Sequence, residues 1–155
     1  MIASKLDPRR DPHLILEALY TVPKVQQPGL VGVIAPLLDH SDAYIREEAI
    51  RILVTRWKLE RYLDRAADML VSDKAPDVRG AAAYALAAAA TETTRVKHTR
   101  LLLDSLRNTD EEPNVRGAAY DALLILYRNP AFPTKKRDFD PDLDADWQWV
   151  ETLCG

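Results

Sequence analysis

Residues 73–79, Asp73-Lys74-Ala75-Pro76-Asp77-Val78-Arg79, and residues 110–116, Asp110-Glu111-Glu112-Pro113-Asn114-Val115-Arg116, are near-copies of one short segment. Each copy continues with an alanine three positions after its arginine and a leucine four positions later. The copies, with a looser third one, begin 33 and 37 residues apart, a spacing typical of helical-hairpin repeats, which must stack to bury their apolar faces. The three read Ile45-Arg46…Ala49…Leu53, Val78-Arg79…Ala82…Leu86 and Val115-Arg116…Ala119…Leu123.

Composition places the chain among ordinary globular proteins. Its 155 residues suffice for one domain with a continuous core, and 47% of them are apolar and 29% charged. No apolar run reaches the roughly 18 residues of a membrane span, and residues 1–8 lack the apolar part of a secretory signal. Cys154 is the only cysteine, which excludes an intrachain disulfide. These features predict a cytoplasmic protein with no membrane partner.

The net charge of −3 is unevenly distributed. Residues 138–155 contain five Asp and one Glu without Lys or Arg, which gives −6, so the other residues carry 21 basic and 18 acidic side chains, or +3. A domain that binds duplex nucleic acid normally presents a strongly basic stripe. The nearly neutral body argues against nucleic acid as a partner.

Helical periodicity and start signals predict an all-α protein. Asp11-Pro12 combines an N-cap with a proline at the first helical position, and Asp42 caps a later helix. Pro36 should bend the expected helix of residues 30–39, in which it lies. No strand is expected, because apolar and polar residues never alternate over five positions. The expected helices cover residues 11–21, 30–39, 42–57, 61–72, 76–90, 94–108, 113–128 and 143–153.

The loop Asp-x-x-Pro-x-Val-Arg before an alanine-rich helix resembles the HEAT-repeat family, particularly its short bacterial, phycobilisome-lyase-type HEAT-like repeats. The resemblance covers residues 30–128, although His40 and Ala43 depart from the motif in the first repeat. It implies an α-α superhelix, a short solenoid of antiparallel helix pairs. It also implies that loop acids and arginines link neighbouring repeats as scaffold, here Asp73, Asp110, Arg79 and Arg116.

The whole chain, residues 1–155, is expected to form one repeat domain. Residues 1–29 supply an N-terminal helix and linker, residues 30–128 three repeats, and residues 129–155 an acidic loop and a capping helix. The cap should bury one face, and Trp149 lies roughly 200° round the helix from Trp147. We therefore expect one indole to be buried and the other to be more exposed. The buried face comprises Leu143, Trp147, Val150 and Cys154.

A binding surface is expected on the concave side, which the second helices line. Tyr84 interrupts the run of alanines from Ala81 to Ala90 and is the expected aromatic anchor, with Arg51 and Asp121 at equivalent positions in the flanking repeats. Mixed charge at these positions favours a protein partner over a phosphate backbone. The candidate partner-binding residues are Glu47, Glu48, Arg51, Tyr84, Asp121 and Arg128.

Motifs for other chemistry are weak. Asp140 to Glu151 has a calcium-loop spacing but Ala145 where the sixth position needs Gly, and acids there suit a helix N-terminus. His13, His40 and His98 lack a ligand partner at helical spacing, so we expect neither a metal nor a cofactor. A basic group could touch nucleic acid, but we expect a solvated run that offsets the acidic tail. That group comprises Lys135–Arg137 with Arg95, Lys97, His98 and Arg100.

The sequence therefore predicts a non-catalytic protein–protein interaction module that binds a protein along its concave face, with no small-molecule substrate. Three alternatives stay open. One is an immunity- or antitoxin-type inhibitor of a toxin domain, a role of some small bacterial relatives in the family. A second is a bilin lyase subunit, for which Cys154 is the only candidate nucleophile. A third is a DNA-binding HEAT protein of the alkylation-repair kind.

Overall fold

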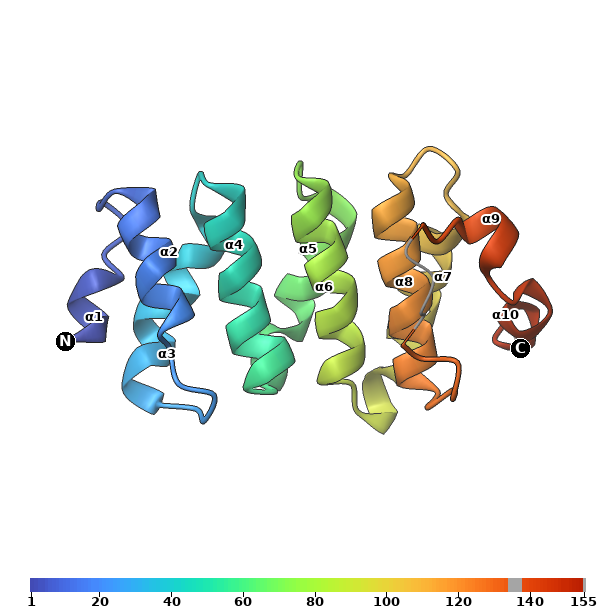
Figure 1. Ribbon diagram of the computed structural model, residues 1–155. Coiled ribbons are helices and arrows are strands. Elements are labelled where there is room, and N and C mark those ends of the chain that lie inside the picture. The colour runs from blue at the N-terminus through green and yellow to red at the C-terminus, as the bar shows by residue number, and fades with distance from the viewer. Residues whose placement is uncertain (134–137, 155) are drawn as a thin grey trace.

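The computed structural model describes residues 1–133 and 138–154, and within these ranges every regular element is a helix (Figure 1). The helices form a row, with the two chain ends at its opposite ends. None of the described helices is long and apolar enough to cross a membrane. The fold is an all-α solenoid.

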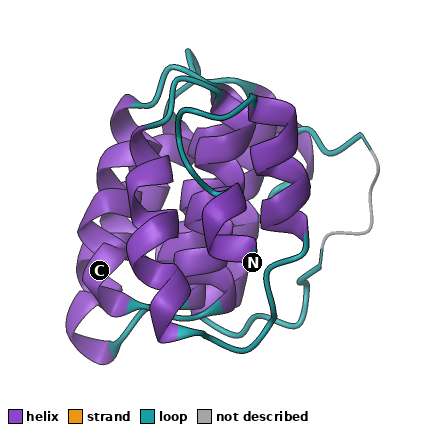
Figure 2. Cartoon of the chain, turned by 90° about the vertical axis from the view of Figure 1, so that its left-hand side faces the viewer, coloured by secondary structure: helices purple, strands orange, loops and turns teal. Residues whose placement is uncertain are grey.

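Two layers of helices make up the row. Helices α2, α4, α6 and α8 stand side by side in one layer, and α3, α5 and α7 lie behind them (Figure 1). Figure 2 looks along the row from its N-terminal side and shows helices joined by loops. The elements are α1 (Ile2–Lys5), α2 (Pro12–Tyr20), α3 (Pro28–Ile34), the 3₁₀ helix η1 (Ala35–Asp39), α4 (Ala43–Ile50), the π-helix η2 (Arg51–Arg56), the 3₁₀ helix η3 (Glu60–Tyr62), α5 (Leu63–Ser72), α6 (Pro76–Ala88), α7 (Glu92–Arg107), α8 (Pro113–Leu126), α9 (Pro141–Asp144) and α10 (Trp147–Thr152).

Helix starts follow the sequence signals. The Asp11 carboxylate accepts a hydrogen bond from the His13 N–H at 2.8 Å, and Asp42 accepts from the N–H groups of Tyr44 and Ile45. Proline occupies the first turn of α6 and of α8, where a missing N–H leaves no hydrogen bond unmade. At Ala35, next to Pro36, the helix tightens from α to 3₁₀ geometry, which is the interruption expected there. Local sequence thus sets where the repeats begin.

The stripe that the repeat register predicts lies in the core. Its members come from the second helix of each repeat, and every one is fully shielded from solvent at 0% exposure. The alanines of α6 let this helix pack closely between α4 and α8, as expected for a methyl-rich helix with neighbours on both sides. The stripe consists of Ile45, Ala49, Leu53, Val78, Ala82, Leu86, Val115, Ala119 and Leu123.

A ladder of ion pairs joins successive repeats. The arginine near the start of each second helix reaches an acid that follows it in the chain, and its guanidinium also donates to nearby backbone carbonyl groups. Each pair is bidentate, the geometry that makes Arg–carboxylate contacts strong. The rungs are Arg46–Asp73, Arg79–Glu111 and Arg116–Asp142, with closest N–O distances of 2.8, 2.6 and 2.6 Å.

The ladder confirms the scaffold role expected for Asp73, Arg79 and Arg116, but the expectation for Asp110 was wrong. Asp110 is exposed. Asp73 both accepts from a backbone N–H and binds an arginine, and in the longer second loop two different residues make these contacts. Asn108 accepts from the backbone N–H two residues on, as Asp73 does, while Glu111 binds the arginine. The first loop comprises residues 73–75 and the second residues 108–112, so the acid that reaches the arginine is shifted along the chain.

The C-terminal segment caps the row, but not as one helix. Ala145 has an extended backbone (φ −71°, ψ 142°) and separates α9 from α10. Val150 is fully buried, whereas Leu143 is 81% exposed because the break turns it away from the face it was expected to share. Trp147 and Trp149 are both half-buried, so the expectation that one indole is buried was wrong.

Candidate functional site

The second-helix face, the solvent-exposed surface of α4, η2, α6 and α8, carries a bridge between two repeats. Tyr84 of α6 is half-buried, and its hydroxyl donates to Oδ2 of Asp121 on α8 at 2.8 Å. The two residues are 37 positions apart, which is the spacing between the second and third repeats. They therefore occupy equivalent positions on the neighbouring helices α6 and α8. Burial, and then the hydrogen bond to the Asp121 carboxylate, raises the pKa of Tyr84, so its hydroxyl stays protonated.

Asp121 has one satisfied and one unsatisfied oxygen. Oδ2 accepts from Tyr84, while Oδ1 is buried and has no hydrogen-bond partner among the described residues. A buried carboxylate oxygen without a donor is unfavourable, and in native proteins it usually finds a partner. Because Oδ1 is buried, Asp121 acts at the surface through its negative charge and not through this oxygen.

Arg51 and Glu47 lie beside this bridge on the first repeat. Their side chains form an ion pair at 2.6 Å across one helical turn, and Arg51 lines the same hollow as Tyr84. Burial raises the pKa of Glu47. The structure thus brings together four of the six candidate residues: Glu47, Arg51, Tyr84 and Asp121.

Glu48 and Arg128 do not join this group. Glu48 is 7% exposed and its carboxylate lies 3.4 Å from Arg56, because it is turned about 100° round the helix from Glu47. Helix α8 ends at Leu126, so Arg128 is no longer on it; its backbone is left-handed (φ 51°), and the side chain lines a separate hollow with Thr91. Helical spacing separates Glu48 from Glu47, whereas the end of α8 before Arg128 could not be counted from the sequence.

Two hollows flank Tyr84 along the face. The acidic hollow, of about 300 Å³, lies over the N-terminal half of α8, and the apolar hollow, of about 380 Å³, lies over η2 and the C-terminal halves of α6 and α8. Tyr84 belongs to both. The acidic hollow includes Asn114, Gly117, Asp121, Asp138 and Phe139, and the apolar hollow includes Arg51, Thr55, Ala81, Ala88, Ile125 and Phe132.

Phe132 and Phe139 are site residues that the sequence analysis missed. They are the only two phenylalanines of the chain, and both lie between α8 and α9. The Phe139 ring stacks on Tyr120 with a centroid distance of 5.3 Å and lies next to Gly117, where a Cβ atom would come 3.6 Å from it. The concentration of both phenylalanines in one loop was the available signal.

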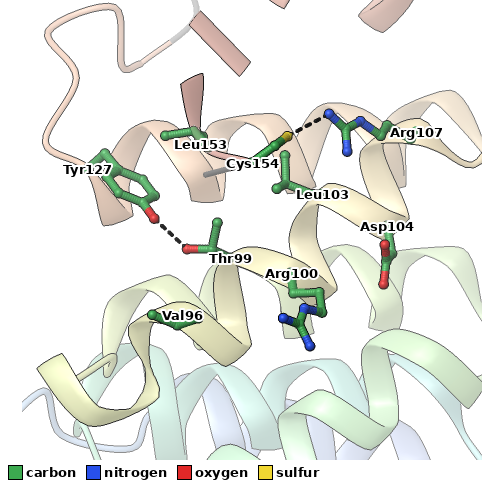
Figure 3. Close-up of a pocket in the computed structure, with 9 residues that line it drawn as sticks. All are labelled: Val96, Thr99, Arg100, Leu103, Asp104, Arg107, Tyr127, Leu153 and Cys154. Carbon is green, nitrogen blue, oxygen red and sulfur yellow. Dashed lines mark hydrogen bonds between the residues drawn. The ribbon is translucent and has the colours of Figure 1, made fainter. Parts of the chain in front are cut away.

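A third hollow lies on α7, away from the second-helix face (Figure 3). The sulfur of Cys154 lies 2.8 Å from Nη2 of Arg107, which also pairs with Glu151 at 3.0 Å. The Tyr127 and Thr99 hydroxyls form a hydrogen bond on the opposite side of the hollow (Figure 3). These contacts fasten the end of the chain to α7.

The acids of the C-terminal segment make structural contacts. Asp140 accepts from the Asp142 N–H at 2.9 Å and Asp146 from the Trp149 N–H at 2.9 Å, so each caps a short helix. Asp142 is the ladder acid. This confirms the helix-terminus role expected for acids here. Within residues 1–133 and 138–154, no group of three His, Cys, Asp or Glu side chains is placed to hold a metal ion.

The histidines and the basic group also have local partners. His98 is 1% exposed with Nδ1 3.0 Å from the Leu86 carbonyl oxygen, so it cannot contact nucleic acid. His13 does have a carboxylate at helical spacing, contrary to expectation, since Glu17 lies 3.2 Å away. Lys97 pairs with Asp64 at 3.0 Å, and the Arg95 guanidinium stacks over Tyr127. Lys135–Arg137 lie outside the described residues.

A family model for HEAT repeats matches residues 3–87. The chain belongs to the HEAT-repeat family. The match begins in α1, before the expected first repeat, which agrees with the position of α2 in the same layer as α4, α6 and α8. Neither the curated proteins nor the solved structures contain a match to the chain.

Proposed function

We propose that this HEAT-repeat protein is a non-catalytic interaction module that binds a protein on its second-helix face. HEAT repeats generally serve as protein-interaction scaffolds. The observation that carries the proposal is the bridge from Tyr84 to Asp121, which stands between two open hollows in the middle of the row. Interface energy concentrates in such central aromatic anchors.

The charges of this face suit a protein more than a nucleic acid. Arg51 is neutralised by Glu47, and Asp121 and Asp138 add negative charge beside Tyr84. A phosphate backbone would be repelled by the two aspartates, whereas a protein surface can supply groups complementary to both signs. The mixed charge therefore supports the protein partner.

The test compares variants in capturing a partner from cells of the native host. Tyr84→Ala and Arg51→Ala should each weaken the complex by about 1–3 kcal/mol. Asp68→Ala, an exposed change on α5 in the other layer, should retain the partner. Thermal melts must accompany the comparison, because Tyr84 is half-buried and bridges two repeats. If Tyr84→Ala binds as wild type does while Asp68→Ala loses the partner, the second-helix face is not the site.

A finer version of the proposal is an immunity-type inhibitor that occludes a toxin domain. The net negative charge of these 155 residues supports it, because an acidic inhibitor can cover a basic catalytic surface. Co-expression of the chain with the product of a neighbouring reading frame should then rescue host growth. Rescue by Tyr84→Ala as complete as by the wild type would separate inhibition from this face.

A further inference from the structure

Among the described residues, the acidic hollow is lined by acceptors and by no cationic side chain. Its described lining includes the carboxylates of Asp121 and Asp138, the Asn114 amide and the Tyr84 hydroxyl, and no Lys or Arg. Arg51, which lines the neighbouring apolar hollow, is held by Glu47 at 2.6 Å. The described residues therefore leave the negative charge of this hollow without a balancing partner.

One oxygen of the Asp121 carboxylate lacks a donor among the described residues. Oδ2 of Asp121 is occupied by the Tyr84 hydroxyl, which leaves Oδ1 as the acceptor that lacks a donor. Thr55 Oγ1, in the apolar hollow, is a second buried polar atom without a partner among the described residues. Both atoms are buried, so a bound chain meets the charge of Asp121 and not its unsatisfied oxygen.

Aromatic rings border the same place. Phe139 and Tyr84 both line the acidic hollow, and Phe139 is fixed by stacking on Tyr120. A cation next to a carboxylate and an aromatic ring gains both an ion pair and a cation–π contact, and a planar guanidinium uses this combination better than an ammonium group. The chemistry of the acidic hollow therefore matches an arginine side chain best and a lysine second.

The apolar hollow requires a different side chain. Ala81, Ala88, Ile125 and Phe132 supply its hydrocarbon surface, and small residues leave room above α6. Burying an aliphatic or aromatic side chain there removes apolar surface from water, which favours binding in proportion to the area. Tyr84 lines both hollows.

We propose that the partner presents a basic side chain to the acidic hollow and an apolar side chain to the apolar hollow, on the two sides of Tyr84. The inference rests on the proposed function and names the chemistry of the partner. It commits to a protein segment that pairs Arg or Lys with a nearby large apolar residue. Charge complementarity at Asp121 and Asp138 determines the order of the two side chains along the face.

A random-peptide phage library selected on the immobilised protein tests this chemistry. Peptides enriched on the wild type should combine Arg or Lys with Leu, Ile, Phe or Trp. A synthetic peptide from this pool should bind Asp121→Asn at least about tenfold more weakly, because the charge-assisted contact is lost. Asparagine keeps the acceptor for the Tyr84 hydroxyl, so the fold is retained. Asp68→Asn, a charge-matched change on α5, should bind like the wild type.

The outcomes separate this inference from the proposed function. Peptides that need Tyr84 but carry no basic residue, or that bind Asp121→Asn unchanged, overturn the inference and leave the second-helix face as the site. Peptides that bind Tyr84→Ala and Asp121→Asn as tightly as the wild type overturn both. A basic preference that disappears with Asp121→Asn, together with a loss of affinity at high salt, supports the inference.

Discussion

Replacing Asp73 by Asn removes the charge of one ladder rung and tests whether the ladder stabilises the stack. Arg46 and Asp73 have side chains that are only 7% and 9% exposed, joined by contacts of 2.9 and 2.8 Å. Removing one partner leaves a buried, uncompensated charge, which costs about 3–5 kcal/mol. The lower end of this range applies, because Arg46 keeps its hydrogen bonds to the carbonyl groups of His40 and Ser41. We expect a loss of about 3 kcal/mol.

Asp142→Asn provides the matched control. It removes the carboxylate charge from another bidentate rung, but the Asp142 side chain is 60% exposed, so water can replace part of what is lost. Its effect on the free energy of unfolding should be clearly smaller. Urea denaturation at pH 7 measures both variants, provided that the slope with denaturant stays constant. Equal losses in the two variants, or a loss below about 1 kcal/mol for Asp73→Asn, refute the reasoning.

The same rung predicts a pH dependence. Burial alone would raise the pKa of Asp73, but the hydrogen bonds from Arg46 and from the Ala75 N–H outweigh it and lower the pKa below 3.8. A depressed folded-state pKa means that the contribution is complete above the pKa of the unfolded chain and is lost as the pH falls through the folded value. The gap between wild type and Asp73→Asn should therefore be constant near neutrality and narrow below about pH 4.

Two further predictions concern the core. Leu86→Ala leaves a cavity at a fully buried position and should lower the free energy of unfolding by about 2–5 kcal/mol, as measured by urea denaturation. Val71→Ala, at an exposed position, should lower it little. A loss below about 1 kcal/mol for Leu86→Ala contradicts the repeat register. Burial raises the pKa of Glu48, so ionisation of this side chain opposes folding as the pH rises through the raised pKa. Glu48→Gln should therefore melt at a higher temperature than the wild type at pH 7 and at the same temperature below about pH 4; a lower melting temperature at pH 7 would show that the Arg56 pair dominates.

The core could be read from the sequence because it depends on local periodicity. A branched residue, a small residue and a leucine at fixed helical spacing lie on one face of a helix whatever its neighbours are, so Val78, Ala82 and Leu86 were placed correctly. The ladder was only partly predictable. Which of Asp110 and Glu111 meets Arg79 depends on the path of a loop that is longer than its counterpart, and sequence identity with Asp73 favoured the wrong residue.

The binding surface was less accessible to sequence reasoning, because it depends on contacts between distant segments. Tyr84, Asp121 and Arg51 follow from equivalent repeat positions, and the structure places them together. Glu48 was assigned to the face as a position on a second helix, together with Glu47, although one step along a helix turns a side chain by about 100°. Phe132 and Phe139 come from a loop, for which no periodicity predicts a position.

The acidic segment at the C-terminal end connects the scaffold with the proposed site. Asp142 pairs with Arg116 where the loop acid of a further repeat would stand, so the cap satisfies the last arginine of the ladder. Solenoids need such a cap, because their terminal repeat otherwise exposes an unpaired face. Phe139 precedes this acid by three positions and lines the acidic hollow. The contact that ends the stack therefore also positions a wall of the binding surface, and a weakened cap should reduce partner affinity as well as stability.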